Sequence, residues 1–231
     1  MDARPWWRQP GKVFYEWLLM MKPIGLENRK KPTLAVDTEG GGANVHVSGY
    51  VNGTFGIQTI YFDMLRIDPI VKRTCTPVSG IQEQDVMRGN TLENVRKKLL
   101  FIFKDKRVIV HGDCDMSALN LTTEELIQNG VEIVDTAKLY RDSNMQPIGL
   151  ENHDKFWYEG KKLQRGSWHH PINGHSPERD CRLTLLIYKK YIQFQESQQD
   201  QPSGNDIRKA RNSTYNFNKW KQERASSRTS Q

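Results

Sequence analysis

Cysteine is scarce in this chain of 231 residues, and its placement excludes several kinds of site. The three cysteines, Cys75, Cys114 and Cys181, lie far apart, and no two of them form a Cys-x-x-Cys pair. A disulfide framework needs an even and closely spaced set of cysteines, and a structural zinc site needs paired Cys or His ligands. The sequence therefore argues against both and fits a reducing, intracellular compartment.

Long apolar runs are missing as well. The most apolar stretch, residues 13–21, is too short to cross a hydrocarbon layer of about 30 Å, and Glu16 lies in its middle. A secretory leader is a poorer interpretation, because Asp2 and Glu16 interrupt the pattern and no small-residue cleavage site follows. We expect this stretch to be an amphipathic element that packs on the domain, and we expect no membrane partner.

Acidic residues are outnumbered by basic ones, and the net charge is +7. Residues 201–231 contribute most of this excess, with seven Lys or Arg and two acids. A basic balance fits a polyanionic partner, although most basic tails are simply solvated. We divide the chain into a basic, aromatic extension at 1–32, a folded domain at 33–195, and a polar then basic tail at 196–231 that we expect to be disordered.

Residues 34–39, Leu-Ala-Val-Asp-Thr-Glu, predict a strand with two carboxylates on one face. Side chains alternate along a strand, so the bases of Asp37 and Glu39 lie about 6 to 7 Å apart on the same side, and one divalent cation could bridge them. The glycines at 40–42 remove side chains where the strand ends, which lets a substrate approach closely. An isolated Asp-x-Glu is more often a solvated strand end, so the rest of the chain must decide.

An opening meander is predicted after this strand. Residues 43–51 and 57–65 alternate as strands do, and Asn52-Gly53 between them is a strong hairpin signal. Asn90, with Glu93 three residues later, predicts the start of a surface helix that covers the sheet.

Strands and helices then alternate. The β-branched run at 108–110 predicts a buried central strand, and residues 131–134 predict another. Thr122 and Glu125 between them form a second candidate capping box. We therefore expect an α/β domain with a mixed central sheet, three antiparallel strands followed by parallel strands, flanked by helices.

The last predicted helix of the domain carries a third acid. Ser176 is a good N-cap, and Pro177 suits the first helical position, where its missing N–H costs nothing. This places His175 in the preceding loop and Asp180 in the first full turn. Asp180 shares a helix face with Leu183, Thr184, Ile187 and Tyr191, so we expect it to point toward the sheet.

One segment is repeated within the chain. Residues 145–152 match residues 21–28 with six consecutive identities, Pro-Ile-Gly-Leu-Glu-Asn. Nothing around the two copies repeats, so this is not a solenoid. We interpret the segment as one turn or docking element used twice.

The acids occur in a fixed order: a strand with Asp-x-Glu, an Asp that opens a helix after a buried strand, and a His before an Asp-bearing helix. This order resembles the DEDDh 3′→5′ exonucleases of the ribonuclease H-like fold. The blocks at 76–81, 115–119, 135–136 and 172–180 are further similar to the RNA exonuclease 4 and interferon-stimulated exonuclease branch, over about residues 33–192.

The chain departs from that branch at three places. The spacer between the histidine of the second block and its Asp is shorter than usual, so Asp113 competes with Asp115; we choose Asp115 because the Asp-x-x-Ala-Leu register then fits. Gly40 and Gly41 replace bulkier residues that often wedge against the terminal base. Residues 150–170 do not show the usual helix before the last block.

The resemblance implies a site for two Mg²⁺ or Mn²⁺ ions held by Asp37, Glu39, Asp115 and Asp180. Carboxylates this close repel one another by ~4 kcal/mol per close pair at an effective dielectric of about 20, and hard divalent cations relieve that repulsion. Two ions about 3.5 to 4 Å apart can stabilise both the attacking and the leaving oxygen. By the same resemblance, His175 takes a proton from the attacking water. Implied substrate contacts are Thr38, Gly40, Gly41, Ser79 and His111.

These observations favour a metal-dependent 3′→5′ exonuclease that hydrolyses single-stranded RNA, DNA or both to nucleoside 5′-monophosphates. RNA is favoured by the branch alone. We expect an intracellular location, in the nucleus or the cytoplasm, with the nucleus slightly favoured. A catalytically silent nucleic-acid-binding or scaffolding protein is the second hypothesis, against which the intact acids and His175 speak. A third, a generic α/β domain, requires Asp37 and Asp180 to lie far apart.

The tail has two interpretations of equal weight. It adds sequence-independent affinity through phosphate contacts and base stacking, or it is a solvated tail or nuclear import signal. The residues concerned are Arg208, Lys209, Arg211, Lys219, Trp220, Lys221 and Arg224.

Overall fold

The structure is a computed structural model. It describes residues 31–50, 57–66, 81–112, 114–158, 176–197, 201–209 and 216–229, without the side chains of 227–229. The extension before residue 31, the Asn52-Gly53 turn, Ser79, Asp113 and His175 lie outside the described residues.

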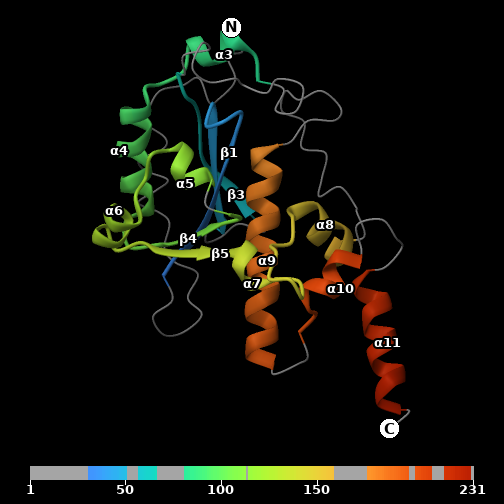
Figure 1. The fold of residues 1–231 in the computed structure, drawn as a ribbon. Helices are drawn as coiled ribbons and strands as arrows, with labels where there is room; N and C mark the ends of the chain where they lie inside the picture. The colour runs from blue at the N-terminus through green and yellow to red at the C-terminus, as the bar shows by residue number, and fades with distance from the viewer. Residues whose placement is uncertain are drawn as a thin grey trace, which may run out of the picture.

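The described residues form a five-stranded mixed sheet in the order β3-β2-β1-β4-β5 (Figure 1). β1 pairs antiparallel with β2, and β2 antiparallel with β3, whereas β4 pairs parallel with β1 and β5 parallel with β4. This is the predicted arrangement of three antiparallel strands followed by parallel ones. The strands are β1 (Thr33–Glu39), β2 (Asn44–Tyr50), β3 (Ile57–Met64), β4 (Arg107–Val110) and β5 (Glu132–Asp135).

Helices flank the sheet, as predicted. In the part of the chain that the structure describes, no helix is both long and apolar enough to span a membrane. The helices are α3 (Glu83–Met87), α4 (Leu92–Phe103), α5 (Cys114–Ala118), α6 (Thr123–Gln128), α7 (Thr136–Leu139), α8 (Leu150–Tyr158), α9 (Pro177–Ser197), α10 (Gly204–Lys209) and α11 (Phe217–Thr229).

Alternation along β1 assigns its side chains to two different cores. Leu34 and Val36 belong to the core that α4 covers, whereas Ala35 packs with Cys181 and Leu185 of α9. Figure 1 shows α4 and α9 on opposite sides of the sheet. Because side chains two residues apart share a face, Asp37 and Glu39 follow Ala35 onto the α9 side.

The start of α4 differs from the prediction. Its N-cap is Thr91, whose hydroxyl accepts from the Asn94 backbone N–H at 3.3 Å, and not Asn90. The backbone of Asn90 is instead held beside β3, where its N–H donates to the Met64 carbonyl and its carbonyl accepts from Arg66. Because these bonds hold Asn90 beside the strand, the helix begins one residue later than predicted, with Thr91 as its N-cap.

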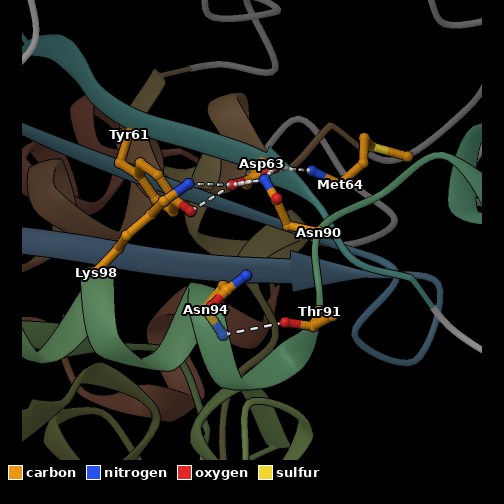
Figure 2. Close-up of polar contacts among 7 residues, drawn as sticks. All are labelled: Tyr61, Asp63, Met64, Asn90, Thr91, Asn94 and Lys98. Atoms are coloured by element: carbon orange, nitrogen blue, oxygen red, sulfur yellow. Dashed lines mark hydrogen bonds and ion pairs between the residues drawn. The ribbon is translucent and has the colours of Figure 1, made fainter. Parts of the chain in front are cut away.

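The displaced Asn90 side chain joins a polar network around Asp63 (Figure 2). The Asp63 carboxylate accepts from the Asn90 side-chain amide at 2.8 Å, from the Tyr61 hydroxyl at 2.6 Å and from Lys98 Nζ at 3.2 Å. Asn90 precedes α4 and Lys98 lies on it, so this carboxylate ties β3 to the helix that covers the sheet.

A further core lies beyond the sheet, at the side of α9. It joins α8, α10 and α11 to α9, and we predicted neither the helix α8 nor order after residue 195. These helices were missed because their sequences are mostly polar. α8 buries Asn152, His153 and Asp154, and the tail contributes few, widely spaced apolar residues. The buried residues of this core are Tyr140, Ile148, Phe156, Trp157, Leu183, Ile187, Phe194, Ile207 and Trp220.

The second copy of the repeated segment leads into α8. Gln146 accepts from the Asp142 N–H through its carbonyl, and Ile148 is fully buried. Residues 145–149 therefore form the turn that delivers the chain to α8, which fits the predicted turn; the first copy lies outside the described residues.

Candidate metal centre

Three of the predicted ligands converge at the carboxyl end of β1. One oxygen each of Asp37, Glu39 and Asp180 lies within 4.8 Å of the other two. The third interpretation from the sequence, a generic domain with Asp37 far from Asp180, is therefore wrong.

Glycines end β1 at this point. Gly40, Gly41 and Gly42 all have positive φ, of 62, 65 and 91°, which a residue with a side chain rarely adopts. The turn is closed by the Ala43 N–H, which donates to the Glu39 carbonyl at 2.9 Å. A Cβ on Gly42 would lie 3.1 Å from the Cβ of Ala118, so the turn also lets α5 pack against it.

Asp180 reaches the strand because of how α9 begins. Pro177 opens the helix as predicted, and the Ser176 carbonyl accepts from the Asp180 N–H at 2.9 Å. The next residue, Cys181, is fully buried, and its Sγ donates to the His46 carbonyl at 3.1 Å. This contact with β2 sets the rotation of the first turn, which presents Asp180 to β1.

Asp115 lies beside this cluster, held by the residue between Asp37 and Glu39. Its Oδ1 accepts from the Thr38 backbone N–H at 2.9 Å and from the Thr38 hydroxyl at 2.8 Å. Asp115 is buried on α5 and is not part of the 4.8 Å group. The competing residue, Asp113, lies outside the described residues, so the choice between the two stays a prediction.

Burial and neighbouring carboxylates raise the pKa of two of the acids, Asp37 and Asp115. Burial raises the pKa of Asp37 well above its usual range, and the charges of Asp115, Asp180 and Glu39 raise it further. Burial also raises the pKa of Asp115 to about 6, against the two hydrogen bonds from Thr38 and with further contributions from Asp180 and Asp135. Asp37 Oδ2 is buried, and no described residue hydrogen-bonds to it.

An unpartnered buried oxygen among repelling carboxylates is the donor set that a hard divalent cation fits. The crowding is unfavourable for the protein alone, and oxygen ligands of this kind suit Mg²⁺ and Mn²⁺. The site could therefore hold divalent metal.

The predicted substrate residues divide into three groups. Gly40 and Gly41 lie directly beside the acids, and Thr38 uses both its backbone N–H and its hydroxyl on Asp115. His111 lies after β4, where Nδ1 is 2.9 Å from the Thr136 hydroxyl; burial lowers the pKa of His111. Ser79 and His175 lie outside the described residues.

The sequence analysis missed residues that line the back of the site. Asn44 Oδ1 accepts from the Glu39 N–H at 2.9 Å, which fixes the backbone of that ligand. His46 pairs directly with Asp37 across β1 and β2 and is buried. Burial, aided by Arg182, lowers the pKa of His46 to about 3, so it stays neutral. The hairpin register was the available signal, since it sets which β2 residue faces Asp37.

Asp135 is another neighbour that the sequence analysis had left without a role of its own. Its Oδ1 accepts from the Gly112 N–H at 2.8 Å and from the Ala137 N–H at 2.9 Å, so it caps α7 and holds the loop after β4. The same carboxylate adds to the negative charge that Asp115 experiences.

Comparison with known proteins supports the fold. Neither a protein-family model nor a curated protein matches the sequence. Among solved structures, the chain is similar to the Neurospora crassa Pan2 catalytic unit (protease and nuclease domain), with a TM-score of 0.54 and 17% sequence identity. The match covers 78% of this chain and 30% of that one. Similarity at this identity shows the fold alone, and the observed α/β domain with a mixed central sheet is the predicted fold class.

Proposed function

We propose that this chain is a metal-dependent 3′→5′ exonuclease that hydrolyses single-stranded RNA, DNA or both to nucleoside 5′-monophosphates. The observation that carries the proposal is the convergence of Asp37, Glu39 and Asp180 within 4.8 Å at the end of the central strand of the mixed sheet. Asp115 beside them completes the order of acids that the sequence predicted.

Asp37, Glu39, Asp115 and Asp180 would hold two Mg²⁺ or Mn²⁺ ions. Bound there, such ions supply Lewis-acid stabilisation of the charge that develops on the attacking and leaving oxygens. The chain's own contribution is rigidity: Thr38 orients Asp115, Asn44 holds the backbone of Glu39, and Cys181 sets the rotation of α9 behind Asp180. Ligands fixed in this way need little reorganisation during the reaction.

The proposed reaction is hydrolysis at the last phosphodiester. Water attacks the phosphorus, the bond from phosphorus to the 3′ oxygen of the preceding nucleotide breaks, and the products are a nucleoside 5′-monophosphate and a strand with a new 3′ hydroxyl. His175 is proposed to take the proton of the attacking water, since an imidazole with a reference pKa near 6.5 suits that task at neutral pH. Its neighbour Ser176 begins the turn that carries Asp180.

The finer assignment rests on the sequence blocks at 76–81, 115–119, 135–136 and 172–180. They support a place in the RNA exonuclease 4 and interferon-stimulated exonuclease branch, and with it RNA as the preferred substrate. Gly40 and Gly41 leave the space above the acids free of side chains, which would let the terminal nucleotide approach closely.

The test is digestion of 5′-labelled single-stranded RNA and DNA of one sequence, with Mg²⁺, Mn²⁺ or EDTA. We expect a ladder that shortens from the 3′ end and is abolished by EDTA, by Asp37→Ala and by His175→Ala. Glu124→Gln, which removes an exposed acid of α6, is the matched control and should retain full activity. Binding without metal-dependent shortening would instead favour the silent nucleic-acid-binding protein.

A further inference from the structure

Three lysines gather where the second half of α9 meets α11. Lys189 and Lys190 lie on α9 and Lys221 on α11, and we call these residues the lysine cluster. Phe194 of α9 contacts Phe217 of α11, with ring centroids 6.1 Å apart. Figure 1 shows that α11 begins beside α8 and α10, away from the start of α9.

Aromatic rings hold the ammonium groups of the cluster in place. Lys221 Nζ lies 4.7 Å and Lys190 Nζ 5.9 Å from the centroid of Phe217, within the range of cation–π attraction. Phe217 is itself fixed, because it stacks on Trp220 at 5.5 Å with an interplanar angle of 15°. Lys189 Nζ lies 5.6 Å from the ring of Tyr50, at the end of β2.

The cluster has positive charge without compensating carboxylates. Among the described residues, no Asp or Glu forms an ion pair with any of the three lysines; the ion pairs of α9 lie in its first turns, Arg179 with Asp154 and Arg182 with Glu178. Burial lowers the pKa of Lys190, and the charges of Lys221 and Lys189 lower it further. An anion between Lys190 and Lys221 would relieve this repulsion.

We propose that the lysine cluster binds backbone phosphates of the nucleic-acid strand whose 3′ end lies at the acidic residues, a proposal that rests on the proposed function. Lys190 follows Asp180 by ten residues, which is about 15 Å along a helix at 1.5 Å per residue. A strand that reaches both places would span a few nucleotides, as single-strand sites commonly do. The cluster thus recognises the strand upstream of the nucleotide that is removed.

An anionic membrane surface fits the cluster less well. Helices that bind at a bilayer surface bury an apolar face in the headgroup region. The exposed side chains of α11 include Asn218, Lys219, Lys221 and Gln222, whereas Trp220 is 5% exposed and packs inward. The same burial removes Trp220 as a stacking platform for bases, so contacts here would be to phosphates and insensitive to base sequence.

The experiment measures binding of a labelled 20-nucleotide single strand, with Asp37→Asn in every protein to stop hydrolysis. Log Kd is followed against log salt for this parent and for the parent with Lys190→Gln and Lys221→Gln. Loss of two phosphate contacts should weaken binding and reduce the slope by about 1.4, or 0.7 per contact on a single strand. Lys97→Gln with Lys104→Gln, two exposed lysines of the α4 region, is the charge-matched control and should leave the slope unchanged.

A second readout separates this proposal from the proposed function. With Asp37 intact, hydrolysis of the 4-nitrophenyl ester of thymidine 5′-monophosphate, which is too small to reach the cluster, should be the same with and without the two lysine substitutions. Absence of hydrolysis of both this ester and the labelled RNA and DNA strands would refute the exonuclease, and the 20-nucleotide binding data would still decide on the cluster.

Two results would overturn the proposal. One is an unchanged affinity and salt slope for the 20-nucleotide strand in both the double variant and Lys221→Glu, an exposed single change that spares the packing of α9. The other is a loss of binding to phosphatidylserine vesicles with no loss of nucleic-acid binding, which would make the cluster a membrane contact.

Discussion

At the residue scale, Asp37 illustrates how the candidate metal centre opposes stability. Its Oδ2 is buried without a hydrogen-bond partner among the described residues, and three neighbouring carboxylates raise its pKa together with burial. A carboxylate with a raised pKa is disfavoured in the folded state at neutral pH. The folded protein therefore carries an unfavourable charge there, which a cation would offset.

Asp37→Asn should stabilise the metal-free protein at pH 7, by about 0.5 to 2 kcal/mol, because it removes a repelling charge and keeps the shape of the side chain. Thermal unfolding in EDTA measures this effect. Added Mn²⁺ should raise the melting temperature of the wild type much more than that of the variant, because a ligand stabilises only the state that binds it. A variant less stable than the wild type in EDTA would contradict this account of Asp37.

His153 predicts how stability depends on pH outside the acidic site. This histidine is fully buried between Tyr140 and Trp157, and burial, followed by the charge of His111, lowers its pKa to about 3. The unfolded chain takes up the proton near pH 6.5, while the folded protein does not until about pH 3. Its contribution to stability is therefore present above pH 6.5 and is lost as the pH falls from 6.5 toward 3.

His153→Gln keeps an acceptor for Trp157 and removes this titration. Between pH 6 and 4 the free energy of unfolding of the wild type should fall by up to ~1.4 kcal/mol per pH unit more steeply than that of the variant. Urea unfolding at each pH gives the two slopes, and slopes rather than absolute stabilities are compared. Parallel slopes would show that His153 is protonated in the folded protein.

At the element scale, the Asp63 network joins β3 to α4 (Figure 2). Asp63→Ala would leave the buried Tyr61 hydroxyl, the Asn90 amide and Lys98 without this acceptor, and we expect a loss of about 1 to 3 kcal/mol in urea unfolding. Glu93→Ala removes the exposed partner of Lys97 and should have little effect on urea unfolding, because solvent screens this ion pair. Equal losses in the two variants would mean that the network does not anchor the helix.

The C-terminal helices make a second prediction at this scale. Ile207 of α10 is fully buried in the core that includes Phe156 and Trp157 of α8. Ile207→Ala should therefore cost about 2 to 5 kcal/mol and speed amide exchange in α8. Ser226→Ala on exposed α11 is the control and should have little effect. An unchanged free energy of unfolding in Ile207→Ala would mean that α10 does not pack on the domain in solution.

These elements also show what can be predicted from sequence. The alternation in β1 and the Ser-Pro start of α9 are local signals, and they placed Asp37, Glu39 and Asp180 on the elements where they lie. α8, α10 and α11 have weak local signals, because their stability comes from tertiary packing of a few apolar residues among many polar ones. His46 was missed for a related reason: its place opposite Asp37 depends on strand register, which composition does not show.

At the scale of the whole molecule, the sheet brings together acids that are distant in the sequence. β1 carries Asp37 and Glu39, α5 after β4 carries Asp115, and α9 crosses the sheet with Asp180 at its start. The core under α4 and the core around α8 and α11 contain none of these acids, which meet at the end of β1. The order of the acids along the chain predicted their meeting only through the resemblance, because no local rule joins residues 37 and 180.

The measurement that tests the central claim most directly is Mn²⁺ binding, by calorimetry and electron paramagnetic resonance, to the wild type and to Asp180→Asn. Asp180 comes from α9 and its partners come from β1, so binding that depends on all of them requires the fold described here. We predict that the wild type binds up to two Mn²⁺ ions and that Asp180→Asn lowers the affinity for Mn²⁺ at least tenfold. The control variant Glu124→Gln should bind Mn²⁺ with the affinity of the wild type. Equal Mn²⁺ binding by all three proteins would contradict the metal centre and the exonuclease proposed from it.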